Sequence, residues 1–214
     1  MELTWNEVLA ATNAKVHSGK LRGNDAIPKI TTDTRKIETG DLFIALRGEN
    51  FDGAEFAADA LQKGASAVLV GAPLSKSVEK ALKNAKGAVL TVSDTLAAYQ
   101  AIAHAWRMKF GVPVVAITGS NGKTTTKDLT AAVLSARGTV CRTAANYNNE
   151  VGLPLTLLGM TGGDVAAVVE IGMRGLGQIA ALAPVAAPSI GIVTNVCEVH
   201  MELLGSIENI AKAK

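Results

Sequence analysis

The chain has 214 residues, and its 48% of hydrophobic residues is enough for a folded core and too much for a disordered protein. Its 21 Lys and Arg nearly balance its 19 Asp and Glu, so the net charge of +2 excludes no fold but gives no electrostatic reason to expect nucleic acid or an anionic membrane as a partner. Cys141 and Cys197 fit neither a disulfide scaffold nor a metal-binding spacing. With no signal peptide and no apolar run of the roughly 20 residues that a membrane helix needs, we expect a cytoplasmic protein without membrane insertion.

The first 92 residues predict a small α/β unit. Thr4 and Glu7 have the spacing of a capping box, which marks a helix start, and Gly64 suits the position after a helix end. In chain order, the predicted elements are a helix from Trp5 to about Ala11, a strand at 42–46, a helix at 54–63, a strand at 67–70, a polar helix or linker at 75–86 and a strand at 89–92.

After residue 92, strands and helices alternate, which predicts a parallel sheet with helices on both faces. The predicted elements are a helix from Ser93 or Asp94 to about Lys109, strands at 114–118, 140–143, 166–171 and 190–195, helices at 123–137, 153–158 and 176–183, and a last helix capped by Ser206. We place a domain boundary near Val92, so that residues 1–92 and 93–214 form two domains. Because the chain stops within a predicted helix and no closing strand follows, we expect the second domain to be truncated and the chain to be a fragment.

The stretch TGSNGKTT, residues 118–125, joins a predicted buried strand to a helix. A phosphate-binding loop (P-loop) needs glycines that let the backbone approach the anion, a lysine for the phosphates and a hydroxyl for Mg²⁺. Gly119, Gly122, Lys123 and Thr124 supply these in order, although Ile117 stands where the full P-loop pattern has its first glycine. A plain strand-to-helix turn with a surface lysine is the alternative, and the flanking strand, glycines and threonines favour the phosphate loop.

This loop resembles the ATP loop of the Mur ligases, the ATP-dependent amide-forming enzymes of peptidoglycan precursor synthesis. Residues 31–65, with TTDTR and GDLFIALRGENFDG, resemble the UDP-sugar-binding N-terminal domain of that family. The stretches ANYNNEVGLPLTLL (145–158) and VVEIGMRGLGQI (168–179) resemble the branch that adds D-alanyl-D-alanine, and residues 194–214 resemble the T-N-x-x-x-x-H stretch and the lysine after it. The chain departs from the family at Ala145, where glycine is common, and at Cys197, Glu198, Val199 and Met201 around His200.

The resemblance implies that ATP activates a carboxylate as an acyl phosphate, which an amine then attacks to form an amide. It implies catalytic roles for Lys123, Glu170, His200 and Lys214, the last as a carbamate, and Mg²⁺ ligation by Thr124, Glu170 and His200. The residues implied to bind ATP are Gly119, Ser120, Asn121, Gly122, Lys123, Thr124, Thr125 and Asn195. Glu170 also ends a predicted buried strand, where open α/β sheets bind ligands. The alternatives are a surface glutamate, a helix-capping or core histidine and loop-capping asparagines.

For the acceptor substrate, the resemblance implies contacts from Thr34, Arg35, Glu49, Asn50 and Phe51 to the UDP group, and from Asn148 and Asn149 to nucleotide or substrate. A structural ion pair from Arg35 to Asp33 or Asp41 is the alternative for the arginine. The implied partners are UDP-N-acetylmuramoyl-tripeptide and D-alanyl-D-alanine, and the implied full-length enzyme is a monomer.

Three further functions stay open. One is another Mur branch, which adds a diamino acid, or a folylpolyglutamate-type ligase. Another is a nucleotide-binding module without ligase activity. An ordinary P-loop hydrolase or kinase is disfavoured by the shifted glycine and by the lack of an obvious Walker-B aspartate. Since the family's C-terminal ligase domain is absent, we expect the 214 residues alone to be inactive.

Overall fold

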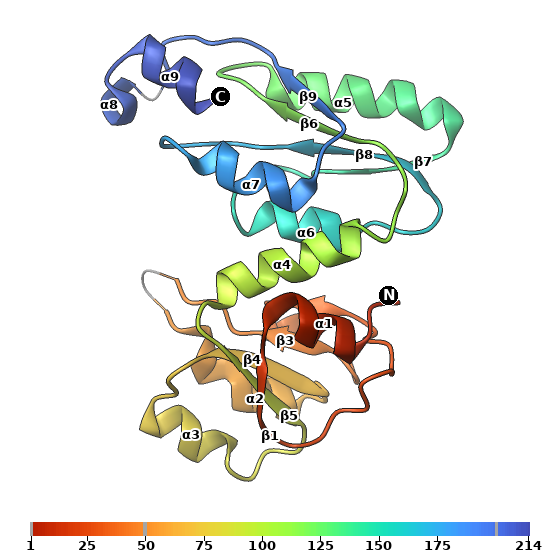
Figure 1. Cartoon of the computed structure of the whole chain (residues 1–214), viewed down its shortest axis with the longest axis vertical. Helices are drawn as coiled ribbons and strands as arrows, with labels where there is room; N and C mark the ends of the chain where they lie inside the picture. The colour runs from red at the N-terminus through yellow and green to blue at the C-terminus, as the bar shows by residue number, and fades with distance from the viewer. Residues whose placement is uncertain (1, 49–50, 200) are drawn as a thin grey trace. The chain divides into compact units, whose positions relative to one another are not determined.

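The computed structural model describes residues 2–48, 51–199 and 201–214, and the chain divides into two compact units, Met1–Ala105 and Trp106–Lys214 (Figure 1). Both units are α/β. Val92, where the sequence suggests a boundary, is the last residue of strand β5 (Ala88–Val92), and the first unit continues through most of helix α4 (Thr95–Arg107).

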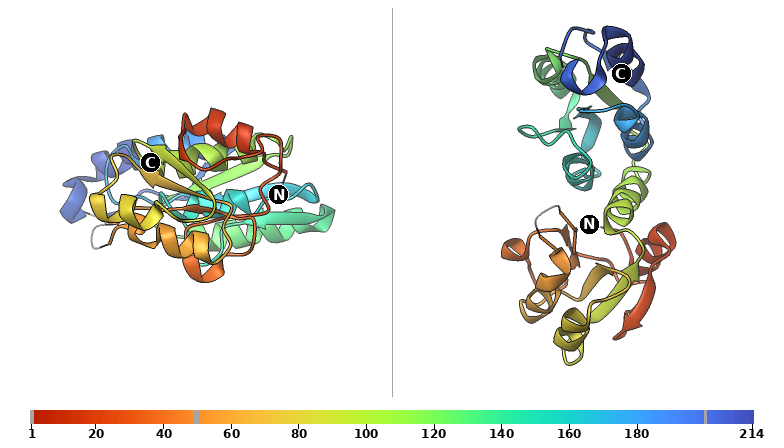
Figure 2. Two further views of the ribbon diagram at one scale, coloured as in Figure 1. Left: turned by 90° about the horizontal axis from the view of Figure 1, so that it is seen from below. Right: turned by 90° about the vertical axis from the view of Figure 1, so that its left-hand side faces the viewer.

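The first unit is built on a five-stranded sheet with the strand order β1-β5-β4-β3-β2. Strands β2 to β5 are parallel, and β1 runs antiparallel to β5 at one edge. Helix α2 and helix α1 lie on opposite sides of this sheet (Figures 1 and 2). The elements are α1 (Trp5–Thr12), β1 (Lys15–Ser18), β2 (Ile30–Thr31), η1 (Thr34–Lys36), β3 (Leu42–Ile44), η2 (Gly53–Phe56), α2 (Ala57–Gln62), β4 (Ala67–Gly71), α3 (Lys76–Leu82), β5 and α4.

Local signals in the sequence explain where the helices of the first unit begin. The Thr4 side chain accepts a hydrogen bond from the Glu7 amide, and the Glu7 side chain accepts from the Thr4 amide, so the predicted capping box is confirmed. Asp94 caps α4 by accepting from the amides of Leu96 and Ala97. The core against α2 and α3 comprises Phe43, Ala45, Ala57, Ala60, Leu61, Ala65, Val68, Val70, Val78, Leu82 and Val89.

The second unit holds a four-stranded sheet with the order β7-β8-β6-β9, and all its strand pairs are parallel. Helix α5 covers one face, and α6 and α7 cover the other (Figure 1). The expected parallel sheet with helices on both faces is therefore confirmed. The elements are β6 (Val114–Thr118), α5 (Lys123–Leu134), η3 (Ser135–Arg137), β7 (Thr139–Arg142), α6 (Gly152–Leu158), β8 (Asp164–Glu170), α7 (Gln178–Ala186), β9 (Ile190–Val193), α8 (Met201–Leu204) and α9 (Ile207–Ala213).

Three of the differences from the sequence-based expectations have a local physical cause. The single helix predicted at 54–63 is a 3₁₀ turn, η2, followed by α2. The helix predicted at 176–183 begins later, after the positive-φ residue Gly177, and runs past Pro184 to Ala186. It continues because Val185 and Ala186 are buried, so packing outweighs the backbone hydrogen bond that proline cannot donate. Strand β1 is missing from the prediction because its four exposed residues show no apolar alternation.

Within the described ranges, no helix is both long and apolar enough to cross a membrane.

Candidate functional site: the phosphate loop and its neighbours

The sheet order of the second unit places the loop 119–122 between two functional segments. Strand β6 leads into this loop, and its neighbour β8 ends beside it, with Ile117 opposite Glu170. On the other side, β9 pairs Val193 with Thr118 and continues into Thr194 and Asn195. Because parallel strands end at the same edge of a sheet, the loop, the acidic residue and the 194–197 segment meet at one edge.

Two glycines let the loop adopt its shape. Gly119 has φ +144°, and a Cβ at this position would overlap the hydroxyl of Thr194. Gly122 has φ +78° and is the N-cap of α5, which begins at Lys123. Both positions therefore favour glycine, and the loop delivers its backbone to the N-terminus of a helix, where peptide N–H groups favour an anion.

The segment after β9 holds the loop in place. The Asn195 side chain accepts from the Asn121 amide at 2.9 Å and donates to the Asn121 carbonyl at 3.1 Å. The Asn195 carbonyl accepts from the Ser120 amide at 3.0 Å, and the Thr194 hydroxyl donates to the Asn121 carbonyl at 2.6 Å. Ser120 and Cys197 add two more bonds, from the Cys197 amide to Ser120 Oγ and from Ser120 Oγ to the Cys197 carbonyl. Asn195 is predicted to bind nucleotide, with loop-capping as the alternative. In the structure, its side chain caps the loop.

Lys123 lies across the loop that it follows. Its Nζ donates to the carbonyls of Gly119 at 2.8 Å and of Ser120 at 3.3 Å. Both carbonyls belong to the loop itself, so the ammonium group is already held beside the loop, where it could reach an anion bound to the neighbouring N–H groups. Thr125 is exposed in the first turn of α5.

Glu170 is a buried carboxylate beside the loop, with 2% of its surface exposed. Its Oε2 accepts from the Thr124 hydroxyl at 2.9 Å, and its Oε1 accepts from the side-chain Nδ2 of Asn148 at 2.7 Å. The structure thus brings together three of the residues that the sequence singled out, and the alternative of a surface glutamate is wrong. Among the described residues, no lysine or arginine forms an ion pair with Glu170.

This donor set fits Mg²⁺ bound together with a nucleotide. Mg²⁺ prefers oxygen ligands and is commonly held by one or two carboxylates plus substrate phosphates, not by an all-protein cage. Thr124 and Glu170 supply a hydroxyl and a carboxylate within hydrogen-bonding distance of each other. The described part of the chain contains no group of three or more His, Cys, Asp or Glu side chains that could hold a metal ion unaided.

The remaining predicted residues of the second unit have different surroundings. Asn149 caps α6, because its Oδ1 accepts from the amides of Val151 and Gly152. Lys214 follows α9, and burial together with the charge of Lys123 lowers the pKa of its amine, while Cys197 acts in the opposite direction. The C-terminal lysine therefore lies within electrostatic reach of the phosphate loop. His200 lies outside the described residues.

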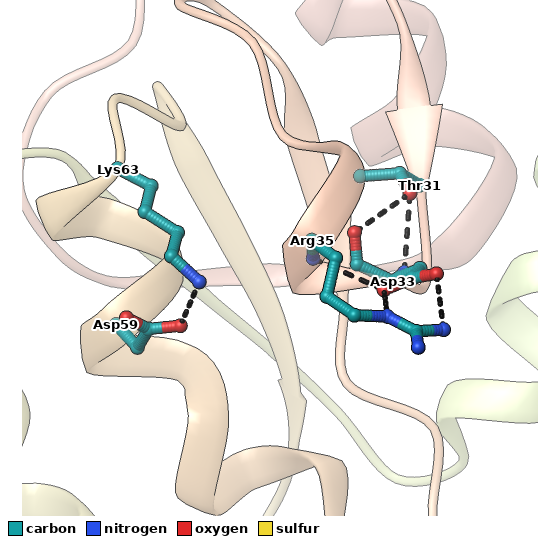
Figure 3. Close-up of polar contacts among 5 residues, drawn as sticks. All are labelled: Thr31, Asp33, Arg35, Asp59 and Lys63. Carbon is teal, nitrogen blue, oxygen red and sulfur yellow. Dashed lines mark hydrogen bonds and ion pairs between the residues drawn. The ribbon is translucent and has the colours of Figure 1, made fainter.

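The predicted UDP-binding residues of the first unit are less closely associated. Arg35 donates through Nε and Nη2 to the two carboxylate oxygens of Asp33, each at 2.8 Å (Figure 3). These hydrogen bonds and the one from the Arg35 amide lower the pKa of Asp33 to about 2. The alternative proposed for Arg35, an ion pair with Asp33, is thus present, although the Arg35 side chain stays 84% exposed and open to a second anion.

The other predicted contacts of this unit are dispersed. Thr34 begins the short helix η1 next to Arg35, and Phe51 is 59% exposed. Glu49 and Asn50 lie outside the described residues. A pocket of about 530 Å³ in this unit is lined partly by Trp5, and of the described residues predicted to bind UDP none lines it.

Sequence reasoning missed the residues that support the site. Thr194 and Cys197 hold the loop, and Thr143 contacts Glu170 through a hydrogen bond from the Glu170 amide to its hydroxyl at 3.0 Å. Threonine and cysteine are common in loops, so these residue types alone could not have identified them. The strand order identifies them, because it places the ends of β7, β8, β6 and β9 side by side.

Comparison with known proteins connects this geometry to a family. Residues 117–214 match the Mur ligase middle domain, and residues 26–107 match a domain described as Mur ligase family, catalytic domain. The UDP-N-acetylmuramoyl-tripeptide–D-alanyl-D-alanine ligase of Synechocystis sp. is 52% identical over 188 residues, which are 88% of this chain and 40% of that protein. The chain thus spans about 40% of the length of the curated relatives it matches.

Two solved structures resemble both units. A crystal structure of MurF from Acinetobacter baumannii has a TM-score of 0.89 and 30% identity, covering 100% of this chain and 46% of that chain. A MurF ligase from Thermotoga maritima, solved in complex with ADP, has a TM-score of 0.76 and 30% identity, covering 87% of this chain and 42% of that chain. The two domain matches, the relatives and the shared architecture agree, and the chain belongs to the Mur ligase family, with its N-terminal and middle domains.

Proposed function

We propose that this chain is the nucleotide- and UDP-sugar-binding part of an ATP-dependent ligase that adds D-alanyl-D-alanine to UDP-N-acetylmuramoyl-tripeptide. The observation that carries the proposal is the convergence of Lys123, Thr124 and Glu170 at one sheet edge, in a chain whose curated relatives bear that activity in their names. The ADP complex of the Thermotoga maritima relative supports ATP as the nucleotide.

In this proposal, the phosphate loop positions ATP for attack by a carboxylate of the tripeptide. The amides at the start of α5 hold the phosphates, and Lys123 leaves the carbonyls of Gly119 and Ser120 to neutralise their charge. Thr124 and Glu170 would hold Mg²⁺, which would neutralise phosphate charge when bound. Asn148 keeps the Glu170 carboxylate oriented through its amide.

In this proposal, the amide bond forms in two steps. The carboxylate oxygen attacks the γ-phosphorus and releases ADP, which gives an acyl phosphate. The amine of D-alanyl-D-alanine then attacks the acyl carbon, loses a proton and expels inorganic phosphate. Burial and the charge of Lys123 lower the pKa of Lys214, and the proposal is that its neutral amine adds to CO₂, loses a proton and forms a carbamate that would help to hold the metal. His200 is assigned as a further metal ligand.

The first unit is proposed to hold the UDP end of the acceptor. Arg35 can share its guanidinium between Asp33 and a diphosphate, because its outer face is exposed. Thr34, Glu49, Asn50 and Phe51 would contact the same group, and Asn149 would support the segment that carries Asn148. We propose that residues 1–92 bind the UDP-linked acceptor and that residues 93–214 bind ATP. The cytoplasmic location and the monomeric state of the whole enzyme belong to the same proposal.

Calorimetric titration of the 214-residue chain tests this assignment. We expect Mg²⁺-ATP to bind and AMP to bind far more weakly, because AMP lacks the phosphates that the loop would hold. UDP-N-acetylmuramoyl-tripeptide is expected to bind, and UDP alone serves as the control for the sugar and peptide contacts. No ligation is expected from these residues by themselves.

Each outcome has a distinct meaning. Equal affinity for ATP and AMP would contradict the phosphate loop. Binding of ATP without binding of the UDP-linked peptide would favour a nucleotide-binding module whose first unit recognises something else. Turnover of ATP and dipeptide into product by the isolated chain would contradict the expectation that it is inactive alone.

A further inference from the structure

The second unit contains a buried cation that the proposed chemistry does not use. Lys127 lies on α5, four residues after Lys123, and only 3% of its surface is exposed. Its Nζ donates to the Thr143 carbonyl at 3.0 Å and lies 3.3 Å from Asp128 Oδ1. Asp128 is half exposed and is also 3.5 Å from Arg142, so it is a shared and solvated counter-ion. Removing an ammonium group from water is costly, and an apolar side chain of the same length would fill the position without that cost.

Thr143 links this lysine to the proposed metal ligand. It is 1% exposed and directly follows β7. Its carbonyl accepts from Lys127, and its hydroxyl accepts from the Glu170 amide at 3.0 Å. Its own amide donates to the Val168 carbonyl at 3.1 Å. The position of Thr143, and with it the peptide that carries Glu170, is therefore fixed from the helix side by Lys127.

The contacts close into a ring through Thr124. Thr124 precedes Lys127 by three residues, which places the two side chains one helical turn apart. Thr124 contacts the Glu170 carboxylate, and Lys127 contacts the Glu170 backbone through Thr143. One helix thus holds both the side chain and the main chain of the same acidic residue.

We propose that Lys127 is a positioning residue, which through Thr143 keeps Glu170 and Thr124 in register for Mg²⁺; this rests on the proposed function. Lys127 touches neither nucleotide nor metal in this proposal. Mg²⁺ demands near-octahedral geometry, and loss of an outer partner of a metal ligand typically lowers metal affinity about 10- to 100-fold. Phosphate binding by the loop itself does not depend on the ring, so the loss should be confined to the contribution of the metal.

The test compares ATP affinity with Mg²⁺ and with EDTA by calorimetry, and the ratio of the two dissociation constants is the metal gain. In Lys127→Met we expect the metal gain to fall about tenfold while affinity in EDTA stays within about twofold of wild type. Arg142→Met is the matched control, since it removes the other cation near Asp128 and should leave the metal gain unchanged. Thr143→Ala should repeat the loss, and Thr143→Ser, which keeps the hydroxyl, should not.

A purely structural role predicts a different pattern, in which both affinities fall together with the thermal midpoint. That result, or an unchanged metal gain in Lys127→Met, would overturn the inference. If Lys127→Met does not fold, the two Thr143 variants decide, and equal metal gains in them overturn it. A wild-type chain with no metal gain would overturn the proposed function as well, whereas a gain that survives Lys127→Met overturns the inference alone.

Discussion

Sequence motifs single out both the phosphate loop and the segment around Arg35, but the two regions differ in the contacts that hold them in place. The loop is held by side chains and backbone from the 194–197 segment, and its neighbours Thr124, Glu170 and Asn148 contact one another. Among the described residues, the Arg35 side chain pairs with Asp33, two residues away and next to the short 3₁₀ turn η1. Long-range contacts fix the first region, and a local contact fixes the second.

The difference concerns how much of each site exists before a ligand binds. In the second unit, four parallel strands deliver their ends to one edge, so the loop needs little rearrangement to receive an anion. In the first unit, the described residues Arg35 and Phe51 are exposed, and Arg35 must exchange or share its bonds to Asp33. We therefore expect substitutions at the loop to have larger effects than substitutions around Arg35.

The largest effect is expected for Lys123→Ala. Loss of a charged hydrogen-bond donor to phosphate costs up to about 3 kcal/mol, which corresponds to an affinity for Mg²⁺-ATP lowered about 100-fold. Calorimetry measures the affinity, and circular dichroism checks that the fold is intact. Lys63→Ala is the control, because Lys63 is a half-exposed lysine at the C-cap of α2, paired with Asp59 in the other unit (Figure 3). Unchanged ATP affinity in Lys123→Ala would contradict the phosphate loop.

A smaller effect is expected for Asn195→Ala, which removes two hydrogen bonds that hold the loop at Asn121. ATP affinity should fall about tenfold, because the loop must then be ordered on binding. Hydrogen exchange of the Asn121 amide should become faster in the free protein. If affinity fell while exchange stayed the same, Asn195 would contact the nucleotide directly, as the family resemblance implied.

Arg35→Ala should weaken binding of UDP-N-acetylmuramoyl-tripeptide by about fivefold and leave ATP affinity unchanged, because Asp33 already neutralises part of the arginine's charge. The pKa of Asp33 is depressed, so its ion pair is complete above the unfolded pKa and is lost only as the pH falls through about 2. The effect of Arg35→Ala should therefore be the same at neutral and mildly acidic pH. An effect that disappears between about pH 6 and pH 4 would show that Asp33 is not the controlling group.

The last prediction concerns a difference in reactivity between the two cysteine thiols. Burial, helped by the charge of Asp164, raises the pKa of the Cys141 thiol to about 12, while Cys197 is exposed next to the loop. An alkylating reagent at mildly basic pH should therefore modify Cys197 and spare Cys141, because the thiolate is the reactive form. Mass spectrometry counts the labels, and the unfolded chain, in which both thiols react, is the control. Rapid labelling of Cys141 would contradict its burial.

Much of the second unit could be predicted from sequence, because short apolar runs alternate with helical segments along the chain. Strand β6 was predicted with its observed bounds, and β7 and β8 within two residues at each end. Strand β1 and helix α8 were missed, since one is four exposed residues without apolar alternation and the other is a single turn. Short elements of this kind depend on their neighbours more than on their own sequence.

The sequence predicted which residues belong to the candidate site better than it predicted what each of them contacts. The motif indicated Lys123 and Thr124, and the end of a buried strand indicated Glu170. Asn148 and Asn149 are adjacent, yet one orients Glu170 and the other caps a helix, a difference that depends on side-chain direction. Lys127 had no motif, and a lysine in a helix is ordinarily exposed, so only its burial and its contact with Thr143 identify it.

The central claim is that the loop 119–122 and Glu170 form one nucleotide site that the chain assembles before ligand binds. The most direct test is a residue-by-residue NMR titration of the amide signals with Mg²⁺-ATP. We predict the largest shifts at residues 119–125 and at Glu170, with only small shifts in the first unit. Shifts centred on the first unit, or none at saturating nucleotide, would contradict the claim.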